Sequence, residues 1–341
     1  MTTSFTRTLG RSRIDVSALG MGCWAIGGPF TFDGRPAGWS QVDDDESIRA
    51  LHRALELGVT LFDTAANYGA GHSERILGRA FADRRGDVVI ATKFGHAVDE
   101  ANRDVTFYDG DEANGDVAAR IRDDVSASLR RLGTDYIDVY QLHVWGLSID
   151  RSLEVRDELD ALVAAGTIRT YGWSTDRADA VRAFATSPGC GVVQQALSVL
   201  DDSNPELLQL CEELGLASVN RSPLGMGLLT GKFAPTTTFA ADDQRNTAEW
   251  HPGFRDGKPT ADWLDKLASI RDVLTSDGRT VTQGALGWIW ARSPVTLPIP
   301  GFKTIAQVEE NCGALEHGPL TAAHMDDIDR ILGRERARSP G

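Results

Sequence analysis

The sequence lacks a long hydrophobic run, an excess of positive charge and a hydrophobic core in its first residues. No apolar stretch approaches the roughly 20 residues that a membrane-spanning helix needs. The 35 Lys and Arg residues are outnumbered by 49 Asp and Glu residues, giving a net charge of −14. Because a phosphate backbone attracts basic surfaces, this balance argues against a nucleic-acid partner. The first residues, MTTSFTRTLG, contain no hydrophobic signal core, so we expect a cytoplasmic protein without a membrane partner.

Cysteine and histidine are also sparse and scattered. The four cysteines form no CxxC pair, and reduced, buried thiols are the expectation for Cys23, Cys190, Cys211 and Cys312. The seven histidines show no metal-ligand spacing, which disfavours a metal-dependent barrel hydrolase. The sequence therefore predicts no metal site.

What the chain does have is a repeating alternation of short apolar runs and helical patterns. With 341 residues, 41% of them hydrophobic, it suits one large domain, residues 1–341. An alternating segment, residues 5–16, predicts an opening hairpin around Gly10. Eight apolar runs then predict strands, at residues 19–24, 60–62, 88–92, 137–142, 170–173, 192–195, 216–219 and 296–299.

Apolar residues recur at helical spacing between several of these runs. Such stripes predict helices at residues 43–57, 117–129, 153–163, 304–312 and 322–332. Parallel strands need crossover connections, and runs that are apolar throughout are typical of strands buried on both faces. Eight such units favour an α/β fold, a (β/α)8 TIM barrel with an N-terminal β-hairpin and long loops at its carboxyl-terminal face.

Three connections are too long for simple turns: residues 25–42, 94–115 and 221–260. Each leaves the carboxyl end of a predicted strand, where barrel active sites form. Long connections in a compact domain are usually functional. We expect them to contain the determinants of ligand choice.

Four polar residues, Asp63, Tyr68, Lys93 and His143, lie just beyond three of the predicted strands. Each has an ordinary explanation: a helix cap, a rim aromatic, a solvated strand end and a core histidine, respectively. Together they favour a catalytic set, because strand ends of a barrel converge on one mouth.

The chemistry of the set is coherent. A tyrosine hydroxyl has a pKa near 10, and a nearby ammonium is expected to lower the pKa of Tyr68. Asp63 would hold Lys93 in place, Tyr68 would act as general acid, and His143 would orient a substrate carbonyl. Such a set protonates an alkoxide as hydride arrives, and the hydride must come from a cofactor.

Four segments then make a specific resemblance. FDTAANYGAGHSERILG, LGTDYIDVYQLH, NRSPLGMGLLTGK and IPGFKTIAQVEEN resemble signatures of the aldo-keto reductase family, in that family's order and over nearly the whole chain. The opening hairpin and LGMGCW match as well. The resemblance implies a (β/α)8 barrel, a nicotinamide cofactor that is usually NADPH, and a tetrad of Asp63, Tyr68, Lys93 and His143.

The resemblance also implies cofactor residues. Ser174 and Gln194 would hold the nicotinamide carboxamide, and Lys303 would suit the 2′-phosphate of NADP(H), although a solvated surface lysine is the alternative. A helix beginning near Thr304 would add a favourable amino terminus. The pyrophosphate set would comprise Ser222, Leu224, Lys232 and Arg245. The adenosine set would comprise Gly301, Lys303, Gln307, Glu310 and Asn311.

The chain departs from the family pattern at three positions. Thr175 stands where asparagine is usual, Leu197 where a tyrosine is common, and Arg221 where an aromatic residue usually stacks on nicotinamide. A guanidinium is planar and can stack too, but it brings positive charge beside the ring. It would disfavour oxidised cofactor or attract an anionic substrate.

Two further features have competing interpretations. The segment Gly20–Ala25 fits GxGxxA, but Gly27-Gly28-Pro29 follows instead of a helix, so it is not a dinucleotide fingerprint. Trp24 and Trp145 stand at strand ends, where they either wall a substrate pocket or pack against the rim.

The leading hypothesis is NADPH-dependent reduction of an aldehyde or ketone. Its alternatives are a sugar or alcohol dehydrogenase working in the opposite direction, and a nicotinamide-sensing regulatory subunit with slow turnover. The expected partner is a small carbonyl compound or sugar. Direction, substrate and oligomeric state stay open at this point.

Overall fold

A closed sheet of parallel strands forms the centre of the molecule. The computed structural model describes residues 5–112, 115–202 and 204–334, so both ends of the predicted domain 1–341 lie outside the described residues. Eight strands are ordered β16-β13-β12-β11-β10-β7-β6-β3, and every neighbouring pair is parallel. Their bounds are β3 Gly20–Gly22, β6 Leu61–Asp63, β7 Val89–Phe94, β10 Ile137–Leu142, β11 Ile168–Ser174, β12 Cys190–Ala196, β13 Ala217–Arg221 and β16 Thr296–Pro298. Each lies on a predicted apolar run, and the predicted (β/α)8 barrel is confirmed.

The barrel closes between β3 and β16 through glycine. Gly22 and Gly301 form a parallel bridge, and the Gly22 amide donates to the Pro300 carbonyl at 3.0 Å. A Cβ atom at Gly22 would lie 2.7 Å from the Ile299 carbonyl oxygen. Any side chain there would therefore push the two edge strands apart.

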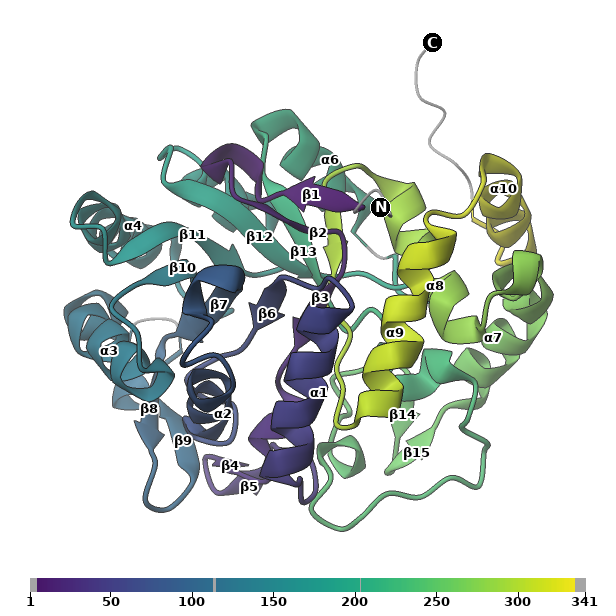
Figure 1. Cartoon of the computed structure of the whole chain (residues 1–341), viewed down its shortest axis with the longest axis horizontal. Helices are drawn as coiled ribbons and strands as arrows, with labels where there is room; N and C mark the ends of the chain where they lie inside the picture. Colours follow the sequence, from purple (N-terminus) through teal and green to yellow (C-terminus); the bar gives the residue numbers. More distant parts are fainter. Residues whose placement is uncertain (1–4, 113–114, 203, 335–341) are drawn as a thin grey trace.

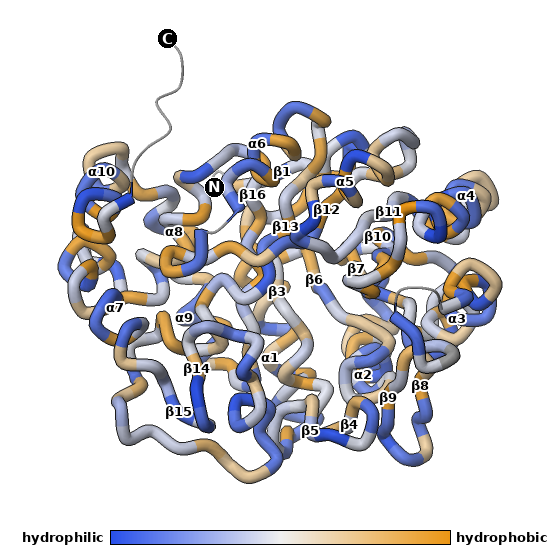
Figure 2. The backbone as a smooth tube through the Cα atoms, turned by 180° about the vertical axis from the view of Figure 1, so that it is seen from behind, coloured by the Kyte–Doolittle hydropathy of each residue, from blue (hydrophilic) through white to orange (hydrophobic). Residues whose placement is uncertain are grey.

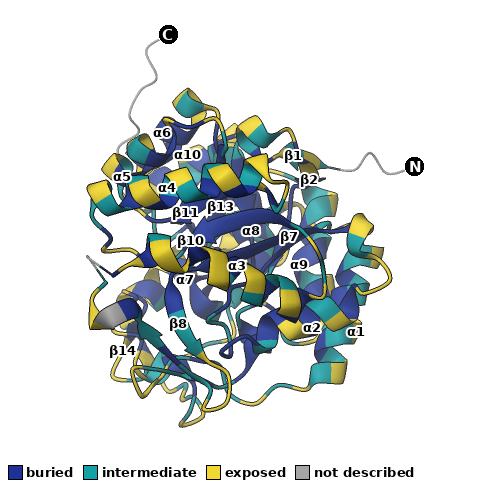
Figure 3. Cartoon of the chain, turned by 90° about the vertical axis from the view of Figure 1, so that its left-hand side faces the viewer, coloured by how far each residue is buried: buried dark blue, intermediate teal, exposed yellow. Residues whose placement is uncertain are grey.

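Helices surround the sheet, with their polar faces outward and their apolar faces toward the strands (Figures 2 and 3). They are α1 Asp44–Glu56, α2 His72–Ala80, α3 Val117–Leu132, α4 Ile149–Ala164, α5 Ala178–Phe184, α6 Pro205–Leu214, α7 Ala261–Leu274, α8 Val281–Arg292, α9 Ile305–His317 and α10 Ala322–Ile331. The sequence assigned ranges to α1, α3, α4, α9 and α10. It gave no range for α2, α5, α6, α7 or α8. In α8 nine of the 12 residues are buried, which leaves no polar face to reveal a helical period.

The opening hairpin covers the amino end of the barrel. Strands β1 Thr6–Thr8 and β2 Asp15–Ser17 are antiparallel and joined through a 3-10 turn at Gly10–Ser12. Leu9, Ile14 and Val16 belong to one buried cluster with inward residues at the starts of the barrel strands. This end of the barrel is filled by apolar side chains.

The three long connections gather at the opposite end, along the lower edge of Figure 1. They contain short strands of their own: β4 Thr31–Phe32, β5 Arg35–Pro36, β8 His96–Asp99, β9 Asp104–Phe107, β14 Phe254–Arg255 and β15 Lys258–Pro259. Two connections that are far apart in sequence combine into one sheet, ordered β5-β4-β9-β8. Among the described residues, no helix combines the length and apolar character needed to cross a membrane, and all four cysteines are buried with free thiols.

Candidate active site

The inward-facing side chains of the barrel strands change from apolar to polar near the carboxyl ends of the strands. Alternate residues of a strand share a face, so the residue two positions beyond an inward residue also points inward. Leu61, Ala91, Val139 and Val192 belong to the apolar cluster inside the barrel. Two positions further along the same strands stand the four members of a polar layer: Asp63, Lys93, Gln141 and Gln194.

Lys93 is the centre of this layer and is almost fully buried. Its ammonium nitrogen donates to Asp63 Oδ2 at 2.6 Å, to the Thr64 carbonyl oxygen at 2.8 Å and to the Tyr68 hydroxyl oxygen at 3.2 Å. A lysine ammonium has three donors, and all three are used here. Asp63, Tyr68 and Lys93, predicted as neighbours, are therefore in direct contact.

The other oxygen of the Asp63 carboxylate faces two amides. Asp63 Oδ1 accepts from Gln194 Nε2 at 2.8 Å and from Gln141 Nε2 at 3.2 Å. Gln194 Nε2 also lies 3.3 Å from Gln141 Oε1. Sequence analysis did not single out Gln141. Its signal was present: a polar residue at an inward position of a strand that is otherwise buried throughout, Ile137–Leu142.

The net effect of the site on Tyr68 differs from the prediction. Burial raises the pKa of the Tyr68 hydroxyl, and Lys93 opposes this by charge and hydrogen bond without reversing it. The expectation of a lowered pKa was wrong because the charge was weighed without the desolvation of a buried phenol. Tyr68 is consequently protonated at neutral pH, the state that a proton donor requires.

His143 faces Tyr68 from the end of β10. The two rings meet edge to face with centroids 6.0 Å apart, and His96 of β8 contacts the other side of His143 at 5.6 Å. Burial, aided by the charge of Lys93, holds the pKa of His143 well below its ordinary value. His143 is therefore a neutral imidazole, and its Nδ1 atom has no hydrogen-bond partner among the described residues.

The two tryptophans predicted at the rim lie in different settings. Trp24 stacks on Tyr68, with ring centroids 5.7 Å apart, and its other contact is edge to face with Trp39. Trp145 is 48% exposed, and the Arg221 guanidinium carbon lies 5.6 Å from its ring centroid. Trp24 thus belongs to the wall beside the phenol, and Trp145 to the outer edge.

Arg221, the residue in place of the usual aromatic, ends β13 and forms an ion pair with Asp176. Its Nε atom is buried and has no partner among the described residues. Its charge acts on both Tyr68 and His143: it partly opposes the raised pKa of Tyr68 and adds to the lowered pKa of His143. The sequence identified Arg221 but not Asp176, which lies 45 residues earlier in the chain.

The residues predicted for the nicotinamide end flank the polar layer. Ser174 ends β11, is fully buried, and its Oγ atom has no hydrogen-bond partner among the described residues. Gln194 stands opposite Ser174 in the register of β11 and β12. Ser222 has a left-handed backbone with φ 53°, which turns the chain after β13, and Leu224 is buried just before the 3-10 segment Gly225–Thr230.

Three predicted cations form an electropositive group near the surface: Lys232, Arg245 and Lys303. Burial lowers the pKa of both lysines, and the charge of Arg245 contributes in each case. Arg245 is held by Asp243 through both carboxylate oxygens and lies over the rings of Phe239 and Trp39. The Lys303 ammonium donates to the Ser40 carbonyl oxygen at 3.0 Å.

The residues predicted for the adenosine end surround the start of α9. The helix begins beside Thr304 as expected, and the Thr304 hydroxyl caps it by accepting from the Gln307 amide at 3.3 Å. Gln307 Oε1 accepts from the Lys303 amide at 2.7 Å, and Asn311 Nδ2 donates to the Gly301 carbonyl at 3.4 Å. Glu310 instead accepts from the hydroxyl of Thr280, which caps α8.

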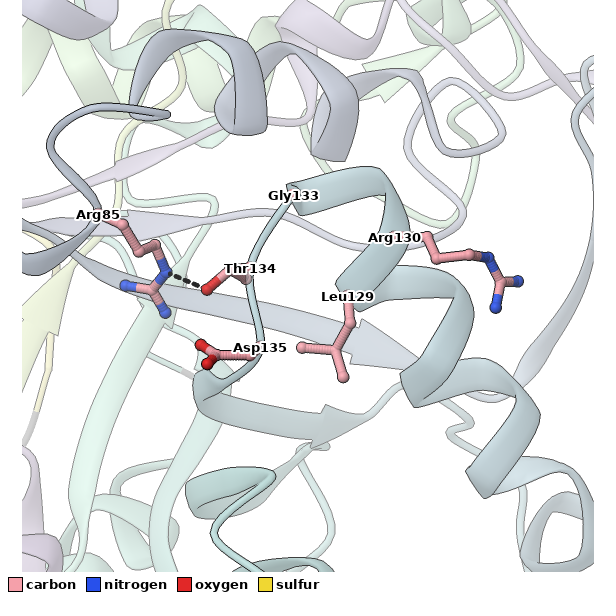
Figure 4. A pocket seen from close by; sticks show the side chains of 6 residues that line it. All are labelled: Arg85, Leu129, Arg130, Gly133, Thr134 and Asp135. Atoms are coloured by element: carbon pink, nitrogen blue, oxygen red, sulfur yellow. Dashed lines mark hydrogen bonds between the residues drawn. The ribbon is translucent and has the colours of Figure 1, made fainter.

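A separate surface depression lies at the other end of the barrel. Figure 4 shows its lining residues, Arg85, Leu129, Arg130, Gly133, Thr134 and Asp135, which precede the starts of β7 and β10. The Arg85 guanidinium is already engaged by Thr134, the Val88 and Tyr136 carbonyls and Asp138. This depression is not part of the candidate site.

A (β/α)8 barrel with a buried Asp–Lys pair touching a tyrosine, and a neutral histidine beside it, defines a class of carbonyl oxidoreductase. The aldo/keto reductase family model matches residues 18–333. Aldo-keto reductase YhdN of Bacillus subtilis is 32% identical over 324 residues, covering 94% of this chain and 91% of that protein. The NADH-specific methylglyoxal reductase of Escherichia coli is 31% identical over 337 residues, covering 97% and 98%.

The solved structures agree. The glycerol dehydrogenase of Gluconobacter oxydans superposes with a TM-score of 0.80 at 31% identity, covering 100% of this chain and 98% of that chain. An aldo-keto reductase of Bacillus halodurans gives a TM-score of 0.75 at 29% identity, covering 96% and 95%. This chain belongs to the aldo/keto reductase family and is an oxidoreductase.

Proposed function

We propose that this chain reduces an aldehyde or ketone to an alcohol with NADPH, and that Tyr68 supplies the proton. The observation that carries the proposal is the direction of the hydrogen bond between Lys93 and Tyr68. Because the ammonium donates, the Tyr68 oxygen is an acceptor, and its own proton is left for a substrate oxygen. The same ammonium then stabilises the phenolate that remains after proton transfer.

His143 and Trp24 would orient the substrate and the phenol. A neutral His143 can donate one hydrogen bond to the substrate carbonyl without adding a charge that would compete with Lys93. Trp24, stacked on Tyr68, fixes the plane of the phenol and restricts water around it. Bound nicotinamide would supply the hydride.

The residues present fit a phosphorylated dinucleotide. Ser174 offers an unpartnered buried hydroxyl beside Gln194 for the carboxamide. The charge of Arg245 contributes to lowering the pKa of both Lys232 and Lys303, and the negative charge of a bound phosphate would oppose that effect. We assign Ser222 and Leu224 to the pyrophosphate segment, Lys303 to the 2′-phosphate, and Gly301, Gln307 and Asn311 to the adenosine end. Glu310 is the weakest member of the set, since its carboxylate is engaged by Thr280.

The relatives support the reaction class and leave its direction to be measured. One is described as a methylglyoxal reductase specific for NADH, another as an NADP-linked aldo-keto reductase, and a third as a glycerol dehydrogenase. Alcohol or sugar oxidation is thus the second candidate function, favoured by the 31% identity to the glycerol dehydrogenase.

A panel of aldehydes, ketones and sugars assayed with NADPH and NADH, followed by cofactor absorbance, tests the proposal. We expect consumption of NADPH with at least one carbonyl compound, and weaker turnover of alcohols with the oxidised cofactor. Tight NADPH binding with negligible turnover of every compound would refute catalysis and favour a nicotinamide sensor.

A further inference from the structure

The two glutamines behind Asp63 have no role in the proton transfer described above. Gln141 and Gln194 are both essentially inaccessible to solvent, and both donate to Asp63 Oδ1, the oxygen that Lys93 leaves free. We propose that Gln141 is a positioning residue: together with Gln194 it fixes the Asp63 carboxylate so that Lys93 is held against Tyr68.

Both polar atoms of the Gln141 side chain are hydrogen-bonded within this network. Its strand neighbour in the register of β10 and β7 is Lys93 itself, so its amide spans the barrel interior toward the carboxylate on β6. Its Nε2 donates to Asp63, and its Oε1 accepts from Gln194. A buried carboxylate oxygen without donors carries a large desolvation cost, and a carboxylate bonded on one oxygen alone can rotate about its χ2 bond.

Lys93 is the group through which this positioning acts. Burial alone would lower the pKa of Lys93, but the charge and hydrogen bond of Asp63, with a further contribution from Tyr68, raise it overall. The other titratable groups facing the pair are Cys23, which is buried, and His143, which is half-buried, and Arg221 acts on Tyr68 from the rim. If Asp63 is released, desolvation prevails and Lys93 loses its proton at lower pH.

Gln194 extends the same network toward the cofactor. On the function proposed above, Gln194 also contacts the nicotinamide carboxamide, so one side chain would serve both the cofactor and the carboxylate. Gln141 restrains this side chain through the 3.3 Å contact of its Oε1 atom. Loss of Gln141 would therefore loosen NADPH as well as Asp63.

Two substitutions at this position separate positioning from packing. Gln141→Met keeps the length of the side chain and removes both hydrogen bonds. Gln141→Glu reproduces both while its carboxyl is protonated, and places a second negative charge beside Asp63 when it ionises. The matched control is Gln195→Met. Gln195 follows Gln194 in β12 and is as buried as Gln141, but it donates to Ser218 Oγ at 2.8 Å rather than to Asp63.

The measurements are the pH dependence of kcat/KM, the dissociation constant of NADPH from protein fluorescence, and the titration of Tyr68 by NMR of isotope-labelled tyrosine. For Gln141→Met we expect the basic limb of the kcat/KM profile, which reports loss of the Lys93 proton, to move down by about one pH unit. The pKa of Tyr68 should move up, because the phenolate then has no ammonium beside it. NADPH binding should weaken several-fold. Gln141→Glu should be active in acid and lose activity as its carboxyl ionises, and Gln195→Met should change stability alone.

The inference would be overturned if both Gln141 variants had the pH profile and the Tyr68 pKa of the wild type. It would also be overturned if Gln195→Met showed the shifts expected for Gln141→Met. Failure of the proposed function has a different signature. In that case Tyr68→Phe would be fully active. If Tyr68→Phe is inactive but both Gln141 variants behave like the wild type, only the positioning role of Gln141 is refuted.

Discussion

The ammonium nitrogen of Lys93 lies 3.2 Å from the hydroxyl oxygen of Tyr68, and the hydrogen bond runs from lysine to tyrosine. This direction sets the polarity of the site. The nitrogen is anchored by Asp63 and the Thr64 carbonyl, and its third hydrogen bond goes to the phenol. The first prediction follows from it.

Tyr68→Phe removes the proposed proton donor and keeps the ring that stacks on Trp24. We expect kcat for carbonyl reduction to fall by roughly 10²- to 10⁴-fold, the range of a general acid, with NADPH affinity almost unchanged. Steady-state kinetics and fluorescence titration measure the two quantities. Tyr136→Phe is the control, since Tyr136 packs under Arg85 at the other end of the barrel. Full activity of Tyr68→Phe would refute the assignment of the acid.

Lys303→Met tests the choice between phosphorylated and unphosphorylated cofactor. Removing one cation from the group formed with Lys232 and Arg245 should weaken NADPH by about tenfold or more and NADH far less, because only NADPH has the 2′-phosphate. Dissociation constants for both cofactors give the ratio. Lys266→Met serves as control, since Lys266 pairs with Asp262 on α7. Equal losses for both cofactors would contradict the phosphate role.

Arg221→Tyr places at this position the aromatic residue that the family resemblance led us to expect there. It also removes the ion pair with Asp176 and a positive charge that acts on Tyr68 and His143. We expect a shift of several-fold in the preference between anionic and neutral carbonyl substrates, or in the ratio of affinities for oxidised and reduced cofactor. If neither ratio changes, Arg221 has a packing role only.

Asp124 should make stability depend on pH. Burial raises its pKa to about 6, although the Tyr108 hydroxyl donates to both of its oxygens at 2.6 Å. A raised folded-state pKa means that the stabilisation is complete below the unfolded value near 3.9 and is lost as pH rises through the folded value.

The unfolding free energy of the wild type should therefore fall by about 1 to 2 kcal/mol between mildly acidic pH, about 5, and neutral pH, relative to Asp124→Asn. Urea denaturation at the two pH values measures the difference. Asp83→Asn is the control, because Asp83 is an exposed aspartate that is not among the groups acting on Asp124. An identical pH dependence in the wild type and Asp124→Asn would refute the prediction.

The sequence by itself determined the barrel and indicated which strand ends hold the polar residues proposed for catalysis. Short runs that are apolar throughout, alternating with helices, admit few arrangements other than a closed parallel sheet. Asp63, Lys93 and His143 stand at or next to the ends of such runs, and the ends of parallel strands meet at one mouth. These are consequences of local pattern and chain direction, which a sequence contains.

Only the tertiary structure decided which groups pair across the mouth. Asp176 holds Arg221, Ser40 binds Lys303, and Gln141 with Gln194 holds Asp63. It also decided the net pKa of Tyr68, because the desolvation of a phenol depends on everything packed around it. Contacts between residues distant along the chain depend on how strands and loops are brought together in three dimensions, and no local periodicity encodes them.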